Sequence, residues 1–108
     1  MANATEQIII RNKLDPDDIK YLLPHQANKR IIDATAEKIN LDKNKVLMNI
    51  EEYGNTTAAT IPLLMHDYEN NFKKGDKIIL AAFGAGLTWG AAYLTCLLYT
   101  SPSPRDDQ

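Results

Sequence analysis

The sequence predicts an α/β fold, with a mixed β-sheet whose elements follow the order β-α-β-α-β-β after an initial helix. Short apolar runs of strand length alternate along the 108 residues with longer segments in which apolar residues recur at helical spacing. The last two apolar runs, residues 78–83 and 88–94, are joined by so short a connection that we expect them to pair antiparallel. Strands and helices that alternate in this way are typical of a layered α/β domain.

The length and composition indicate one small folded domain or part of a larger one. Hydrophobic residues make up 44% of the chain, which is enough for a real core, and the formal net charge is −2. No long basic run supports binding to nucleic acid or to an anionic membrane. The single cysteine excludes an internal disulfide framework, and no segment has the length of a membrane span or the apolar core of a signal peptide. We therefore expect a cytoplasmic domain.

The first half of the chain is predicted to contain a helix, a strand and a second helix. Residues 2–13 can form the first helix, and Pro16 fits the first position of a helical turn. Residues 19–23 have the length and apolar character of a strand in a parallel sheet. From Asn28 the pattern becomes helical, and Asn40 is a suitable helix terminator.

The second half is predicted to contain a strand, a helix and the closing hairpin. Residues 46–50 form a short apolar run that indicates a second buried strand. A helix follows over residues 58–72, and Pro62 should lie near its start or mark a kink. The apolar positions of this helix step by 3, 4, 3 and 4: Ala58, Ile61, Met65, Tyr68 and Phe72. Residues 84–86 (Gly-Ala-Gly) are expected to form the tight hairpin turn.

Two predicted strand-to-helix junctions, residues 24–28 and 54–56, carry the candidate chemistry, because α/β folds place ligands and reactions at such junctions. His25 lies in the first, and a helix start beside its ring favours neutral imidazole, which can donate a hydrogen bond to a developing oxyanion. Asn55 lies in the second, where its amide could donate in the same way. The alternatives are a purely structural histidine and a Gly-Asn turn or helix cap.

Other candidate sites are weaker. His25 and His66 are far apart in the sequence and lack an apparent third ligand, so we expect no metal and no other cofactor. His66 lies off the apolar stripe of its helix and should face solvent. The Gly-Ala-Gly segment joins two strands and does not lead into a helix, which argues against a phosphate site, although its backbone amides could still face a site.

Three motifs resemble β-ketoacyl-acyl-carrier-protein synthase III. Residues 24–28 (Pro-His-Gln-Ala-Asn), with residues 30–32 (Arg-Ile-Ile), resemble the histidine motif of that family. Residues 54–62 (Gly-Asn-Thr-Thr-Ala-Ala-Thr-Ile-Pro) resemble its asparagine motif, and residues 83–90 resemble its glycine-rich C-terminal motif. The similarity covers residues 1–95. It implies a thiolase-like half-domain, with the N-terminal half and its nucleophilic cysteine missing.

The resemblance also implies a reaction, the decarboxylative Claisen condensation of acyl-CoA with malonyl-acyl-carrier-protein that starts fatty-acid synthesis. By resemblance, His25 and Asn55 donate hydrogen bonds to the thioester oxygen as the enolate forms. Asn28 matches a position that contacts the pantetheine arm, and Arg30 matches one that docks the carrier protein. Ala85 stands where the family has a glycine whose N–H helps to form an oxyanion hole. The resemblance also implies that the full-length protein is a homodimer.

The C-terminal tail, residues 96–108, does not continue the pattern. Residues 96–106 back-translate onto a transposase adapter used in sequencing libraries, so we expect this tail to be adapter read-through and residues 1–95 to be the natural domain. The alternative is a genuine disordered tail rich in proline and serine. As a half-fold, the fragment is expected to expose apolar faces and to be inactive alone.

Two other functional hypotheses remain open. Another thiolase-like starter synthase, of the polyketide or quinolone type, would share the histidine and asparagine pair. A non-catalytic α/β binding module would not need both His25 and Asn55. The cysteine neighbourhood of the N-terminal half would distinguish the first of these from a synthase III.

Overall fold

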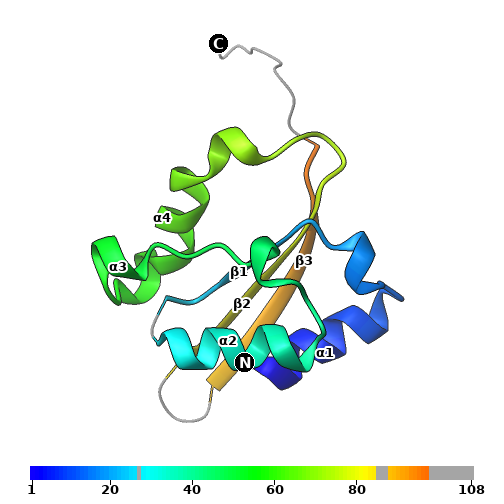
Figure 1. The fold of residues 1–108 in the computed structure, drawn as a ribbon, viewed down its shortest axis with the longest axis horizontal. Coiled ribbons are helices and arrows are strands. Elements are labelled where there is room, and N and C mark those ends of the chain that lie inside the picture. Colours follow the sequence, from blue (N-terminus) through cyan, green and yellow to red (C-terminus); the bar gives the residue numbers. More distant parts are fainter. Residues whose placement is uncertain (27, 85–87, 98–108) are drawn as a thin grey trace.

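A three-stranded sheet lies between two groups of helices (Figure 1). The computed structural model describes residues 1–26, 28–84 and 88–97. Its helices are α1 (Ala2–Arg11), α2 (Lys29–Lys38), α3 (Ile50–Tyr53) and α4 (Thr60–Asp67), and its strands are β1 (Tyr21–Pro24), β2 (Lys77–Gly84) and β3 (Thr88–Thr95). Short 3-10 turns occupy Pro16–Asp18, Lys43–Lys45, Thr57–Ala59 and Glu69–Asn71.

The sheet is mixed, in the order β1-β2-β3. β1 runs parallel to β2, with Tyr21 opposite Ile78, and β2 runs antiparallel to β3, with Lys77 opposite Thr95. This confirms the predicted α/β class and the predicted antiparallel pairing of the last two strands. Ala85 and Gly86 of the expected hairpin turn lie outside the described residues.

Neighbouring residues of β1 and β2 point to opposite faces of the sheet, and each face is buried under a different group of helices. Leu22 and Ile79 belong to a cluster that α1 packs against, whereas Leu23 and Ile78 belong to a cluster with Leu64 of α4. Figure 1 shows α1 and α2 on one side of the sheet and α3 and α4 on the other. The two faces of the sheet therefore meet two separate apolar layers, as an α/β fold requires.

The helix signals in the sequence are largely confirmed. Asn28 caps α2, and Asn40, just beyond the helix, has a φ of 56°, the left-handed conformation that ends many helices. Pro62 is the third residue of α4, where its missing N–H breaks no helical bond. The α4 segment buries its surface differently from the prediction, because its fully buried side chain is Leu64, while the predicted stripe at Ile61 and Met65 is only half-buried.

The predicted strand at residues 46–50 is wrong. Val46 makes one isolated parallel bridge with Leu22, and the N–H of Leu47 donates to the carbonyl oxygen of Leu22 at 3.0 Å. At Asn49 the ψ angle is 19°, which is not that of a strand, and the chain enters α3. The physical reason is a side chain: the N–H groups of Asn49 and Ile50 donate to Oε1 of Gln26. A side-chain amide thus replaces the backbone ladder.

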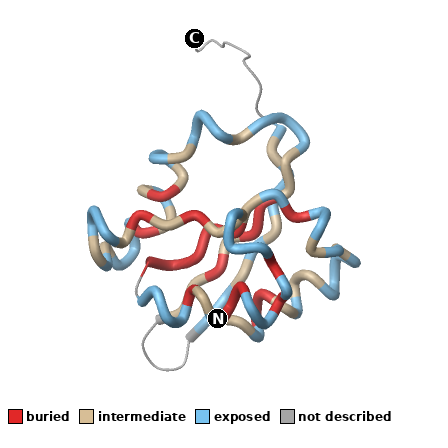
Figure 2. The backbone as a smooth tube through the Cα atoms, viewed as in Figure 1, coloured by how far each residue is buried: buried red, intermediate tan, exposed pale blue. Residues whose placement is uncertain are grey.

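The outer strand, β3, is only partly covered. Tyr93 packs against the cluster on the α1 side, but Trp89, on the same face, is 55% exposed, and Leu94, on the opposite face, is 40% exposed. Figure 2 shows the buried residues mainly along β1 and part of β2, with further buried positions within the helices. Within residues 1–26, 28–84 and 88–97, no helix is long and apolar enough to cross a membrane.

Candidate functional site

His25 directly follows β1, and the sheet holds its backbone in place. The N–H of His25 donates to the carbonyl oxygen of Ala81 at 2.8 Å, so the pairing with β2 continues one residue beyond the strand. The side chain is 9% exposed, and its ring meets that of Phe83 edge to face, with 5.4 Å between centroids and 69° between planes. The end of a buried strand therefore presents a nearly enclosed imidazole in a fixed orientation.

The imidazole of His25 is neutral at physiological pH in this environment. Burial lowers its pKa from 6.5, because removing water penalises the charged form. The direction agrees with the expectation from the sequence, but the cause is burial, where a helix start was expected. Nδ1 is sealed from solvent and has no hydrogen-bond partner among residues 1–26, 28–84 and 88–97. Because such an atom destabilises the fold by about 1–3 kcal/mol, it points to a functional role.

Gln26, the next residue, is 1% exposed and uses its whole side-chain amide. Nε2 donates to the carbonyl oxygen of Pro24 at 2.8 Å and to that of Leu47 at 3.4 Å. Oε1 accepts from the N–H groups of Asn49 at 2.9 Å and Ile50 at 3.1 Å. The amide therefore joins the end of β1 to the start of α3.

Asn55 lies in the exposed loop between α3 and α4. Its Oδ1 accepts from the N–H of Thr57 at 2.9 Å, which forms a local turn. The described residues offer no acceptor to its Nδ2, so the NH₂ group is available as a donor. Gly54, just before it, has φ 65° and ψ −153°, a conformation that glycine alone adopts readily. Asn55 therefore forms a local turn with its side-chain oxygen and keeps its NH₂ group as a donor, so the two roles expected from the sequence are compatible.

The two junctions are connected through Gln26. Its backbone N–H donates to Oγ1 of Thr60, the first residue of α4, at 2.7 Å, while its side chain binds the start of α3. The loop that carries Asn55 runs between these two anchor points. No hydrogen bond, ion pair or ring contact joins His25 directly to Asn55 within the part of the chain that the structure describes.

The other predicted site residues lie at the start of α2 or outside the described residues. Asn28 is the N-cap of α2, and its Oδ1 accepts from the N–H of Arg30 at 2.8 Å. Both side chains are exposed. The cap uses the Asn28 oxygen and leaves its NH₂ group for other contacts. Ala85, the predicted oxyanion-hole residue, lies outside the described residues.

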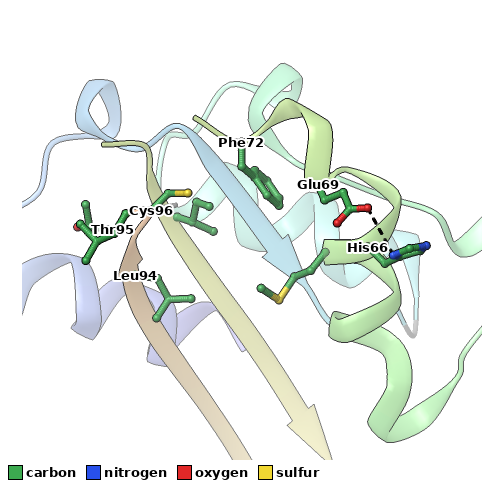
Figure 3. A pocket seen from close by; sticks show the side chains of 9 residues that line it. His66, Glu69, Phe72, Leu94, Thr95 and Cys96 are labelled. Carbon is green, nitrogen blue, oxygen red and sulfur yellow. Dashed lines mark ion pairs between the residues drawn. The ribbon is translucent and has the colours of Figure 1, made fainter. Parts of the chain in front are cut away.

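A separate apolar groove of about 530 Å³ lies at the other end of the strands (Figure 3). It runs between the end of α4, the start of β2 and the end of β3, and His66 on its rim is 74% exposed, as predicted. Cys96 also lines this groove, directly after β3, so it is at the opposite end of the sheet from His25. In the described ranges, no three His, Cys, Asp or Glu side chains gather as a metal site.

Comparison with known proteins identifies the family of this chain. The family described as 3-oxoacyl-[acyl-carrier-protein (ACP)] synthase III C terminal matches residues 9–96. The chain belongs to this family. Its relatives include beta-ketoacyl-[acyl-carrier-protein] synthase III of Porphyromonas gingivalis, 50% identical over 94 residues, or 87% of this chain and 28% of that protein. Synthase III 2 of Bacteroides thetaiotaomicron is 53% identical over 94 residues, with the same coverage of 87% and 28%.

Solved structures of synthase III share the fold. The 3-oxoacyl-[acyl-carrier-protein] synthase III of Aquifex aeolicus matches with a TM-score of 0.85 and 44% identity, over 89% of this chain and 32% of that one. The synthase III of Thermus thermophilus matches with a TM-score of 0.83 and 45% identity, over 89% and 30%. The chain thus spans less than a third of these synthases and corresponds to a C-terminal segment, which confirms the resemblance to synthase III.

Sequence reasoning missed Gln26, Thr60 and Phe83 as residues that surround the candidate site. Phe83 contacts the His25 ring, and Thr60 accepts the hydrogen bond from the backbone of Gln26. A signal for Gln26 was present, because it is a polar residue next to the end of a fully apolar strand. A buried amide in that place needs hydrogen-bond partners. Backbone N–H groups of a neighbouring segment that stops pairing with the sheet can supply them, as those of Asn49 and Ile50 do.

Proposed function

We propose that the full-length protein containing this segment is a 3-oxoacyl-acyl-carrier-protein synthase III. Its reaction is the decarboxylative Claisen condensation of an acyl-CoA-derived acyl group with malonyl-acyl-carrier-protein. The cysteine that carries the acyl group belongs to the part of the synthase beyond this chain, since Cys96 lies at the wrong end of the sheet. The cytoplasmic location expected from the sequence is part of the same proposal.

His25 and Asn55 act at the decarboxylation step. Cleavage of the bond between the malonyl α-carbon and its carboxylate releases CO₂ and leaves the electron pair on the thioester enolate. The charge on the enolate oxygen is stabilised by two neutral donors, the imidazole N–H of His25 and the Nδ2 amide of Asn55. The α-carbon then attacks the acyl-cysteine carbonyl, and the cysteine thiolate leaves.

The observation that carries the proposal is the enclosed, neutral ring of His25, whose Nδ1 has no partner in the described part of the chain. A neutral ring keeps one N–H for the oxyanion and does not add a positive charge that would bind the carboxylate in the ground state. The available Nδ2 of Asn55 supports a second donor. Both are the residues that the family motifs assign.

Asn28 and Arg30 extend the proposal to the carrier protein. Both are exposed at the start of α2, where Lys29 adds a second positive charge. We assign Asn28 to the pantetheine arm and Arg30 to docking of the acyl carrier protein, with Ala85 as a backbone donor to the acyl-enzyme. The full-length synthase is proposed to be a homodimer.

The test is to separate the half-reactions in the full-length protein. Replacement of His25 or Asn55 by alanine should lower the rate of malonyl decarboxylation by about 10²–10³-fold, the usual effect of removing one oxyanion donor. Cysteine acylation by acyl-CoA should remain, because it does not use these donors. Alanine at His66 and at Asn70, both exposed, provides matched controls that should leave both rates unchanged. Wild-type decarboxylation in His25→Ala or Asn55→Ala would contradict the proposal.

A further inference from the structure

We propose that Gln26 is a positioning residue, which fixes His25 relative to the loop that carries Asn55. This inference rests on the proposed function. Gln26 adjoins His25 in the chain, yet its side chain bonds to groups about twenty residues away in sequence, at Leu47, Asn49 and Ile50. It is thereby the polar connection between the two motifs in the described residues.

The side-chain amide is matched to its surroundings. Its NH₂ group meets two carbonyl oxygens, of Pro24 and Leu47, and its oxygen meets two N–H groups, of Asn49 and Ile50. A carboxylate in its place has only acceptor atoms. It would therefore have no hydrogen to donate to the two carbonyl oxygens. An apolar side chain would satisfy none of the four groups. No other side chain of this length presents both a donor pair and an acceptor.

Burial makes these bonds strong determinants of position. Gln26 is 1% exposed, so water has little access to replace a lost partner. The bonds of Asn49 and Ile50 also end the extended segment beside β1 and start α3. The segment that leads to Gly54 and Asn55 is therefore oriented from the same residue that follows His25.

A second bond fixes the other end of the Asn55 loop. The N–H of Gln26 donates to Oγ1 of Thr60 at 2.7 Å, and Thr60 is 5% exposed at the start of α4. Gln26 thus holds both the helix before the loop and the helix after it. If His25 and Asn55 stabilise one enolate oxygen, their separation is set here, and a displacement of about 1 Å can lower a rate by 10².

The experiment compares half-reactions in the full-length protein. Gln26→Met, which keeps the side-chain length, should lower malonyl decarboxylation by about 100-fold and leave cysteine acylation by acyl-CoA near its wild-type rate. Gln7→Met is the control, since Gln7 is exposed on α1. Because Gln26→Met removes four buried hydrogen bonds at once, Thr60→Val provides a milder variant, with an expected loss of decarboxylation of about tenfold. Thr60→Ser should restore it.

Hydrogen exchange gives a measurement that does not depend on activity. In the full-length protein, Gln26→Met should raise the exchange rate of the Asn49 and Ile50 amides by about tenfold, and Gln7→Met should not. Unchanged exchange, or unchanged decarboxylation in both Gln26→Met and Thr60→Val, would overturn the positioning role. So would a parallel loss of both half-reactions in Thr60→Val. If His25→Ala decarboxylates at the wild-type rate while exchange rises as expected, the proposed function fails and the structural connection stands.

Discussion

The histidine junction and the asparagine junction of this synthase III segment are marked alike in the sequence but are held differently in the structure. His25 and Gln26 are buried, and their bonds reach β2, α3 and α4. Asn55 and Gly54 lie in an exposed loop, where Asn55 bonds to Thr57 only two residues away. One junction is built into the core, and the other is attached to it at its ends.

The two candidate donors are therefore held in place in different ways, one by this segment itself and the other with the help of the rest of the synthase. His25 is oriented within this segment, by the strand before it and the ring of Phe83 beside it. Asn55 keeps its donor free but exposed, and a donor in water stabilises an oxyanion far less than one in an enclosed site. We therefore expect the rest of the synthase to cover the asparagine junction and to complete its geometry.

The largest expected contrast in stability lies two residues before each site residue. Leu23 precedes the histidine junction with no exposed surface, and Tyr53 precedes the asparagine junction with 47% of its surface exposed. Leu23→Ala should lower the free energy of unfolding of the full-length synthase by about 2–5 kcal/mol, because it leaves a cavity. Tyr53→Ala should change it by less than about 1 kcal/mol. Denaturant unfolding measures both, and equal effects would show that the junctions are equally built into the core.

A smaller effect is expected at the backbone of the asparagine junction. Gly54 has a φ of 65° and open space where a Cβ would lie, so Gly54→Ala should act through backbone strain alone. We expect a loss of about 1–3 kcal/mol in stability, or a shifted loop with slower decarboxylation. Gly90→Ala is the matched control, because Gly90 also has open space but no positive φ. A Gly54→Ala variant that equals Gly90→Ala in stability and rate would contradict the assignment of strain.

The α/β class, helices α1 and α2, the centre of the predicted helix at residues 58–72, and the antiparallel pairing of the last two strands could be predicted because their signals are local. The short helix α3 was not predicted. Apolar period, the cap at Asn28 and the left-handed Asn40 depend on neighbouring residues. The strand at residues 46–50 was predicted wrongly for the opposite reason: its apolar run is real, but its backbone groups bond to Gln26, more than twenty residues away. The local sequence cannot reveal that these backbone groups bond to a distant side chain where a neighbouring strand was expected.

The candidate site was predictable to a similar extent. The position of His25 between a strand and a helix followed from the pattern. For Asn55 the pattern was wrong about the preceding element, because α3 stands where a strand was expected, and the family motif alone pointed to this residue. The cause of the lowered His25 pKa was not predicted. A helix start was expected to keep the ring neutral, and burial beside Phe83 is what the structure provides. Burial of a particular side chain is a property of the packed fold, which a linear pattern predicts only on average.

The smallest effect concerns pH and distinguishes the junctions by charge. Because burial lowers the pKa of His25 below 6.5, the unfolded chain binds more protons than the folded one just below that pH. The contribution of neutral His25 to the free energy of unfolding should therefore be complete above about pH 6.5. It should decline as the pH falls from 6.5 toward the lowered pKa. His25→Gln should flatten this slope in the full-length synthase, and His66→Gln, at a side chain that is 74% exposed, is the control. Decarboxylation should likewise keep its rate as the pH falls through 6.5, since the ring stays neutral there. Loss of decarboxylation with a midpoint above 6.5 would show that the ring is charged more easily than its burial allows.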